Sequence, residues 1–218
     1  MSAVVKGVRQ YHSPKREAQA AVTRAEIADA AHRLFVAQGY VRTTLADIAE
    51  AAGVAVPTVK VIYGTKRLVL VAAWDRAVKG GPDPRPVAEQ EWYQEILAEP
   101  DPRQHLRLQA AQSRGGKARI SPLIEVMRAA ATTDPEIDAL WTQMQREFHD
   151  NQHRTIKALQ RKGRLRKGLT QRRATDLLYT LNHPTMYHML VVQLGWTDEQ
   201  YGQWLATTLI EQLLEPED

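Results

Sequence analysis

His149 and His153 are the pair of side chains whose spacing is closest to that of a metal site. Imidazoles four residues apart lie on one face of a helix, as in the zinc-binding pattern His-Glu-x-x-His. Here Asp150 stands where that pattern has its glutamate, and no third ligand lies nearby in the sequence. We therefore interpret the two histidines as part of a polar helix face and expect no metal.

The residue patterns of other catalytic chemistries are missing from the sequence. It contains no cysteine, which excludes disulfides, thiolate nucleophiles and cysteine-based zinc or iron–sulfur sites. It also lacks a Gly-x-Ser-x-Gly nucleophile elbow, a Walker loop and a Gly-x-Gly-x-x-Gly fingerprint. We expect neither an enzyme nor a cofactor.

The positive charge of the chain is concentrated in its first third. The 218 residues include 29 Lys and Arg against 25 Asp and Glu, a formal net charge of +4. Up to Arg67 there are 10 basic and 5 acidic residues, a net +5, so the remaining 151 residues carry 19 and 20, a net −1. A basic segment beside a neutral body is typical of a nucleic-acid-binding module joined to a second domain, although a solvated basic terminus gives the same sum.

Length and composition are those of a globular protein with one ordinary domain or two small ones. Hydrophobic residues make up 44% and charged residues 25%, which excludes collagen-like and wholly disordered chains. The longest apolar run, 68–74, is far shorter than a membrane span, and 1–10 lacks the apolar core of a secretory signal. We expect a cytoplasmic protein without membrane contact.

Hydrophobic residues recur at helical spacing and nowhere alternate convincingly with the period of a strand, so we predict an all-α fold. An amphipathic helix is expected over 23–38, ending at Gly39. Thr44 can cap a short helix up to residue 52, and a Gly53-Val54 turn then leads into a second helix over Val56–Tyr63. Two short helices joined by a tight turn form a helix-turn-helix.

The rest of the chain is predicted to form helices separated by Pro, Gly or Asp-Pro. Thr65 is expected to cap a helix that ends near residue 79, before a Gly- and Pro-rich joint at 80–86. The later helices are expected over 87–97, 102–113, 121–132, 135–162, 170–182, 184–195 and 197–214.

Several segments together carry a family resemblance. They are 30–40 (AAHRLFVAQGY), 43–49 (TTLADIA), 52–54 (AGV), 57–59 (PTV) and 63–66 (YGTK). In order and spacing they closely resemble the DNA-binding domain of TetR-family transcriptional regulators across 24–70. The segments 163–170, 174–178 and 195–205 are similar to the C-terminal domain of an actinobacterial-type subset of that family, while about 82–135 is unmatched.

The resemblance implies a homodimer that binds a palindromic operator in double-stranded DNA, with one recognition helix, Val56–Tyr63, from each protomer. It implies a flexible basic arm over 1–22, a DNA-binding domain over 23–70 with its helix-turn-helix at about 44–63, and a helical effector-binding and dimerisation domain over 71–218. The expected activity is repression released by a small, largely apolar effector. The alternative is a DNA-binding regulator without an effector, whose C-terminal domain serves dimerisation or a protein partner.

By the family pattern, the residues expected at the DNA are Thr44, Pro57, Thr58, Val59, Lys60, Tyr63, Thr65 and Lys66. Thr44, Lys66 and the Thr65 cap are expected at phosphates, and 57–60 at base edges, with Val59 more probable as core. Lys60 stands where the family commonly has Tyr, and Ala55 where it has a cap such as Ser, so the operator of a relative does not transfer. Lys6, Arg9, Lys15 and Arg16 of the arm could add minor-groove contacts or be simply disordered.

Two further groups of residues are expected in the C-terminal domain. Candidates for an effector cavity, each of which could instead be ordinary core, are Trp74, Trp92, Tyr93, Met127, Trp141, Met144, Phe148 and Tyr179. Helices over 170–195 and 197–214 are expected to form an intermolecular four-helix bundle. Its candidate contact residues are Leu178, Tyr187, Trp196, Tyr201, Trp204 and Leu205.

Overall fold

The computed structural model describes residues 14–80, 85–163 and 165–216. This described part is helical and contains no strand, which confirms the predicted all-α class. The helices are α1 (Pro14–Arg42), α2 (Leu45–Ala51), α3 (Val56–Tyr63), α4 (Lys66–Lys79), α5 (Glu91–Ala98), α6 (Pro102–Ala131), α7 (Pro135–Lys162), α8 (Gln171–Leu181), α9 (Pro184–Tyr187) and α10 (Asp198–Leu213).

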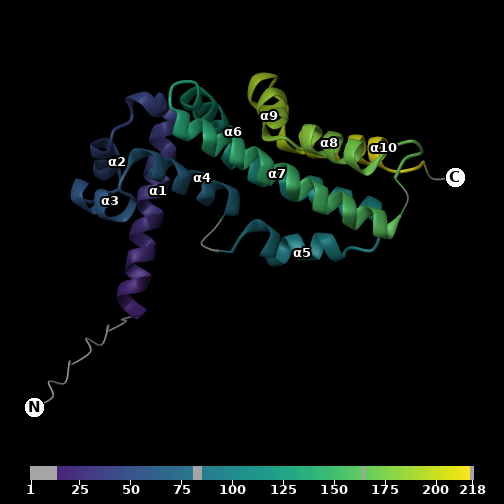
Figure 1. Ribbon diagram of the computed structural model, residues 1–218, viewed down its shortest axis with the longest axis horizontal. Coiled ribbons are helices and arrows are strands. Elements are labelled where there is room, and N and C mark those ends of the chain that lie inside the picture. The colour runs from purple at the N-terminus through teal and green to yellow at the C-terminus, as the bar shows by residue number, and fades with distance from the viewer. Residues whose placement is uncertain (1–13, 81–84, 164, 217–218) are drawn as a thin grey trace, which may run out of the picture.

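The short helices α2 and α3 lie at one end of the molecule, beside α1 (Figure 1). The long helices α6 and α7 run along the length of the rest, with α5 on one side of them and α8 to α10 on the other (Figure 1). No helix in the described ranges is both long and apolar enough to cross a membrane.

The first helix is longer than its hydrophobic pattern indicates. α1 begins at Pro14, which corrects the start expected at residue 23 and makes 14–22 helical. Residues 16–22 are rich in Ala, Arg, Glu and Gln, which favour a helix by propensity, and they are mostly exposed, so they show no apolar periodicity. Arg16 lies on this exposed stretch, whereas Lys6 and Arg9 lie outside the described residues. The predicted stop is confirmed, because Gly39 leaves helical geometry at φ 81°.

The helix α6 corrects a second expectation. Separate helices were expected over 102–113 and 121–132, yet α6 runs without interruption through Gly115, Gly116 and Pro122. Each glycine costs roughly 1 kcal/mol relative to alanine, and a proline removes one backbone hydrogen bond. Contacts along α6 with α1, α4, α7, α9 and α10 outweigh these local costs. Tertiary packing therefore overrides the local helix-breaking signals.

The remaining helices agree more closely with the sequence pattern. α3 and α7 have the predicted bounds. The segment expected over 87–97 is divided at Gln90 into a 3-10 turn, η1 (Val87–Glu89), and α5. The segment expected over 184–195 is α9 followed by a π-helical turn, η2 (His188–Gln193).

Two hydrophobic cores hold these helices together. In the first, buried residues of α1 to α4, among them Phe35 and Ile48, pack with Met127 of α6 and Ile137 of α7. In the second, residues of α6, α7, α8 and α10 pack around Leu106 and Tyr201. Because the first core contains residues of α6 and α7, the helix-turn-helix is joined to the rest of the chain by continuous packing.

Candidate nucleic-acid interface and ligand cavity

The start of α2 is fixed by a capping box. The Thr44 hydroxyl accepts from the Asp47 amide at 3.1 Å, and the Asp47 carboxylate accepts from the Thr44 amide at 2.8 Å. Donation from the Thr44 amide, followed by a contribution from the Thr44 side chain, lowers the pKa of the Asp47 carboxyl. Thr44 is exposed, so it remains accessible at the helix start that the resemblance places on a phosphate.

The helix α3 divides its side chains between the core and the solvent. Pro57 and Lys60 are exposed and Thr58 is half-buried, as base-edge contacts require. Val59 is 0% exposed within the first core, so its expected base contact is wrong and its alternative role as core is confirmed. Val61 is 87% exposed. Sequence reasoning missed Val61, although its spacing of four from Pro57 places both on one helix face.

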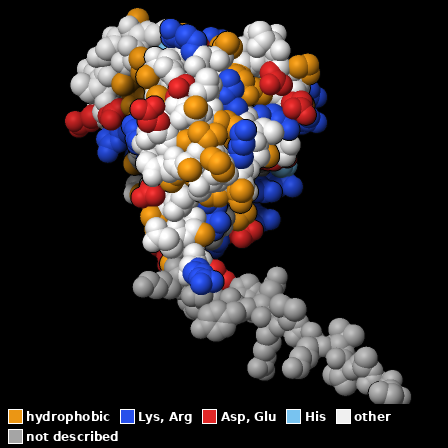
Figure 2. Space-filling view, turned by 90° about the vertical axis from the view of Figure 1, so that its left-hand side faces the viewer, with side chains coloured by type: hydrophobic (Ala, Val, Ile, Leu, Met, Phe, Trp, Pro, Cys, Tyr) orange, Lys and Arg blue, Asp and Glu red, His pale blue; other side chains and the backbone are white. Residues whose placement is uncertain are grey.

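The face that carries α2 and α3 is seen end-on in Figure 2. Hydrophobic side chains gather near its centre with Lys and Arg side chains beside them (Figure 2). At the start of α3, Ala55 provides no side-chain cap for the first amides. Pro57 has no N–H and the Thr58 amide donates to the Ala55 carbonyl at 2.9 Å, so only the Val56 amide of this first turn is left to an outside acceptor, such as a DNA phosphate.

Tyr63 and Lys66 have structural contacts instead of free functional groups. The Tyr63 hydroxyl donates to the Arg24 carbonyl of α1 at 2.9 Å. The Lys66 ammonium donates to the Tyr40 carbonyl at 2.9 Å and lies 4.2 Å from the centre of the Tyr40 ring. Partial burial lowers the pKa of Lys66 and raises that of Tyr63. Through these contacts Lys66 links α4 to the end of α1, and its expected phosphate contact stays a prediction.

Thr65 confirms its predicted role as a helix cap. Its hydroxyl accepts from the Leu68 amide at 3.3 Å at the start of α4. The residue is exposed, so the cap stands at the surface beside α3.

Polar contacts, in addition to the first core, connect α1 and α4 to the long helices α6 and α7. Arg119 of α6 donates to the Ala77 carbonyl of α4 at 3.1 Å, and its own carbonyl accepts from His32 of α1 at 3.1 Å. Gly80 ends α4 at φ 73°, and a side chain there would collide with the Arg119 guanidinium. The ion pair between Arg67 of α4 and Glu136 of α7, at 3.2 Å, adds a further link.

A cavity of about 240 Å³ lies between α4, α5, α6 and α7. The expected residues Trp74, Trp92, Tyr93, Met144 and Phe148 line it. Trp92 and Tyr93 meet edge to face, with ring centres 5.7 Å apart. Aromatic and aliphatic walls of this kind suit an apolar ligand.

Three expected cavity residues lie outside these walls. Met127 is fully buried in the first core. Trp141 packs edge-on against Trp74, with ring centres 6.4 Å apart, and Tyr179 packs behind Phe148 at 5.5 Å. None of the three is among the residues that line the cavity, so they are corrected to packing residues.

The polar end of the cavity was not expected from the sequence. Lys117 of α6, 3% exposed, donates to Asn182 Oδ1 at 2.6 Å and to the Tyr201 hydroxyl at 2.8 Å. Ser113 also donates to Asn182 Oδ1 at 3.0 Å, and Asn182 Nδ2 donates to Gln152 at 3.2 Å. The only local signal was a lysine at helical spacing among apolar residues, and the adjacent glycines suggested a break there instead.

Most of the expected dimer-contact residues face the interior of the protomer. Leu178, Tyr201 and Leu205 are 0% exposed and Tyr187 is 4% exposed, all within the second core. Their apolar character reflects packing inside one chain, so their expected role in a subunit interface is corrected. Trp196 and Trp204, with ring centres 6.2 Å apart, instead line a shallow groove on α10.

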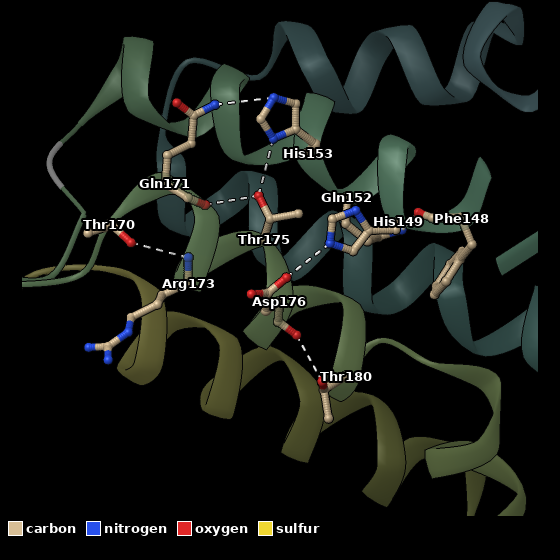
Figure 3. Close-up of polar contacts among 10 residues, drawn as sticks. All are labelled: Phe148, His149, Gln152, His153, Thr170, Gln171, Arg173, Thr175, Asp176 and Thr180. Atoms are coloured by element: carbon tan, nitrogen blue, oxygen red, sulfur yellow. Dashed lines mark hydrogen bonds and ion pairs between the residues drawn. The ribbon is translucent and has the colours of Figure 1, made fainter. Parts of the chain in front are cut away.

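His149 and His153 point to different partners on α8 (Figure 3). His149 pairs with Asp176 at 3.0 Å, whereas His153 lies 3.4 Å from the Thr175 hydroxyl and 3.4 Å from the Gln171 side chain. In the described ranges no group of three or more His, Cys, Asp or Glu side chains could hold a metal ion. The pair connects α7 to α8.

Comparison with known proteins supports the interpretation of the N-terminal domain. Residues 27–73 match the family model of bacterial regulatory proteins, tetR family. A search of the curated proteins found no match.

Solved structures share the fold of the chain at low sequence identity. NalD, the secondary repressor of the MexAB-OprM multidrug efflux pump in Pseudomonas aeruginosa, has a TM-score of 0.67 and 21% identity, covering 91% of this chain and 100% of its own. SmeT of Stenotrophomonas maltophilia, in complex with triclosan, has a TM-score of 0.66 and 19% identity, covering 90% and 98%. A Saccharomonospora viridis protein in complex with choline has a TM-score of 0.65 and 19% identity, covering 89% and 99%.

Proposed function

We propose that this chain, a DNA-binding transcriptional regulator of the TetR family, acts as a homodimeric repressor that a small, largely apolar effector releases from a palindromic operator. The observation that carries the proposal is the helix-turn-helix of α2 and α3, with an exposed Pro57, Lys60 and Val61 on its second helix. We place the DNA-binding domain over 23–70 and the effector-binding and dimerisation domain over 71–218.

We assign base reading to the exposed face of α3. Lys60 is long enough to reach guanine acceptors, and Thr58 and Val61 offer methyl groups to a thymine methyl. The hydroxyl of Thr44 and the Val56 amide at the start of α3 suit phosphates, which position the protein without specifying sequence. One such helix contacts too few bases for tight binding, so a second protomer is needed.

We assign dimerisation to the outer surface of α8 to α10. The turn η2 and its end expose Met189 by 45%, Val192 by 57% and Leu194 by 68%. The groove with Trp196 and Trp204 lies on the adjacent α10. Apolar side chains exposed together favour burial against a second copy, which a two-fold axis would pair with the same surface.

The cavity is connected to the DNA-binding end through α6. Residues of the cavity wall include Arg119, the residue that donates to the Ala77 carbonyl at the end of α4. An effector that favours a different position of α6 would move α4 and change the separation of the two recognition helices. The effector must have different affinities for the two states, because tight binding alone shifts nothing.

The decisive experiment measures binding of the purified protein to fragments of its own upstream region, in a salt titration with random DNA as control. We expect tight binding to one fragment and a steep loss of affinity with salt, because lysine and arginine contacts release counterions. Binding to no DNA at all would contradict the function. Apolar compounds are then screened for release of that fragment.

Thermal stability separates the effector hypothesis from the alternative without an effector. A compound at about one hundred times its Kd adds about 2.7 kcal/mol to the free energy of unfolding. If no apolar compound raises the Tm while operator binding is intact, the C-terminal domain serves dimerisation or a protein partner instead.

A further inference from the structure

Lys117 lies at the polar end of the cavity, deep inside the protomer. Its side chain is 3% exposed, and its ammonium is surrounded by α6, α8 and α10. Both of its hydrogen-bond partners, Asn182 Oδ1 and the Tyr201 hydroxyl, are neutral. The ammonium also lies 5.0 Å from the centre of the Tyr201 ring.

No carboxylate among the described residues forms an ion pair with Lys117. Glu147 also lines the cavity, but it is exposed and accepts from Gln143 at 2.9 Å. An unpaired ammonium in an apolar interior is unfavourable by several kcal/mol. Burial accordingly lowers the pKa of Lys117 well below its ordinary value.

The two hydrogen bonds leave one of the three ammonium donors available at the cavity. The lining of the same cavity also contains the aromatic residues Trp74, Trp92 and Phe148. A ligand that fits both parts has an anionic end and an apolar body. The cavity of about 240 Å³ is below the common range of about 300–1,000 Å³, which favours a short acid.

We propose that the cavity binds an amphipathic carboxylic acid, whose carboxylate pairs with Lys117 and whose apolar part lies against the aromatic walls. This inference rests on the proposed effector function and names the chemical class of the effector. A carboxylate supplies the missing counter-charge, a neutral ligand leaves the ammonium unpaired, and a cationic ligand is repelled by it.

Three probes built on an eight-carbon chain test the inference on the full-length protein: octanoate, octan-1-ol and octyltrimethylammonium. Their Kd values are measured by calorimetry at constant salt and pH. We expect octanoate to bind at least about tenfold more tightly than octan-1-ol, since a hydrogen bond to a charged group contributes about 1.5–3 kcal/mol. Equal or tighter binding of octan-1-ol or of the cation would overturn the inference.

Lys117→Met removes the charge and keeps a side chain of similar length. Lys117→Gln removes the charge and keeps a hydrogen-bond donor for Asn182. In both we expect the preference for octanoate over octan-1-ol to disappear while octan-1-ol still binds. The matched control is Lys157→Met, which removes an exposed lysine of α7 outside the cavity and retains the preference. Retention of the preference in a folded Lys117 variant would also refute the assignment.

The same measurements distinguish this inference from the proposed function. If octan-1-ol binds as well as octanoate, the acid-specific assignment fails while an apolar effector cavity stands. If none of the probes binds, this inference fails, and operator binding tests the DNA-binding function independently.

Discussion

The helix-turn-helix and the ligand cavity satisfy their polar groups over very different distances along the chain. Thr44 and Asp47, and likewise Thr65 and Leu68, are three residues apart. Lys117 instead contacts residues 65 and 84 positions away. The starts of α2 and α4 are therefore fixed by nearby residues of the sequence, whereas the polar end of the cavity exists only when α6, α8 and α10 are packed together.

The largest effect is expected where both regions share a core. Phe35 of α1 is fully buried in the first core, with its ring centre 5.7 Å from that of Tyr40. Phe35→Ala should lower the free energy of unfolding by about 3–5 kcal/mol, because it leaves a cavity between α1 and its neighbours. Chemical denaturation measures the loss, and DNA binding should fall with it.

The control for this substitution is Val36→Ala. Val36 is the next residue but is 42% exposed, so the change should stay within about 0.5 kcal/mol. A Phe35→Ala protein with unchanged stability would show that the first core does not couple the two regions.

The second-largest effect is expected for a substitution in the cavity that should change stability but not DNA binding. Lys117→Met should raise the free energy of unfolding at neutral pH by about 1–4 kcal/mol, since it replaces a buried lysine that has no counter-charge with an apolar side chain of similar length. Asn182 keeps the hydrogen bond from Ser113 in this variant. Operator affinity without effector should change little.

The same variant tests how the contribution of Lys117 to the free energy of unfolding depends on pH. The pKa of Lys117 is lowered in the folded protein, so between that value and the ordinary pKa of 10.5 the unfolded chain binds more protons than the folded one. The stability contribution of Lys117 therefore rises with pH over this window. The advantage of Lys117→Met should shrink as pH approaches 10.5, and an advantage independent of pH would contradict the account.

The difference between local and long-range contacts also explains how much of each region could be predicted from the sequence. The capping box of α2, the bounds of α3 and the end of α4 come from residues close together in the chain, and the sequence indicates all of them. The contact of Lys66 with the Tyr40 carbonyl was not predicted, because the two residues lie 26 positions apart.

In the C-terminal domain, contacts between residues far apart in the sequence determine which side chains line the cavity and which are buried. Aromatic and flexible side chains correctly suggested Trp92 and Phe148 as cavity walls, yet the same signal also selected Met127, which is core. Tyr201 and Leu205 were expected at a subunit surface, but they face inward because α10 packs on α6 and α8. Apolar spacing shows that a face is buried without showing what covers it.

A fourth prediction concerns the exposed lysine of α3, for comparison with the buried lysine of α6. Lys60→Ala should weaken operator binding by about 1–3 kcal/mol if the ammonium reads a guanine, and relax specificity at one base pair. If Lys60 contacts a phosphate, affinity falls uniformly across sequences and the salt slope decreases by about one. Fluorescence anisotropy on operator variants at several salt concentrations measures both quantities.

The matched control is Lys157→Ala, which removes an exposed lysine from α7. It should leave operator affinity and the salt slope close to those of the wild type. Equal loss in the two variants would mean that net charge, and not the position of Lys60 on α3, determines the affinity.

The smallest effect is expected at the cap of α2. Thr44→Ala removes the acceptor for the Asp47 amide, which should lower the free energy of unfolding by about 1 kcal/mol. Thr44→Ser keeps the hydroxyl and should retain most of that stability. Because the contact spans one turn, the loss should leave the octanoate affinity of the cavity unchanged. If Thr44→Ala altered that affinity, the capping box would belong to the coupling between the two regions, and the separation into a local and a long-range site would not hold.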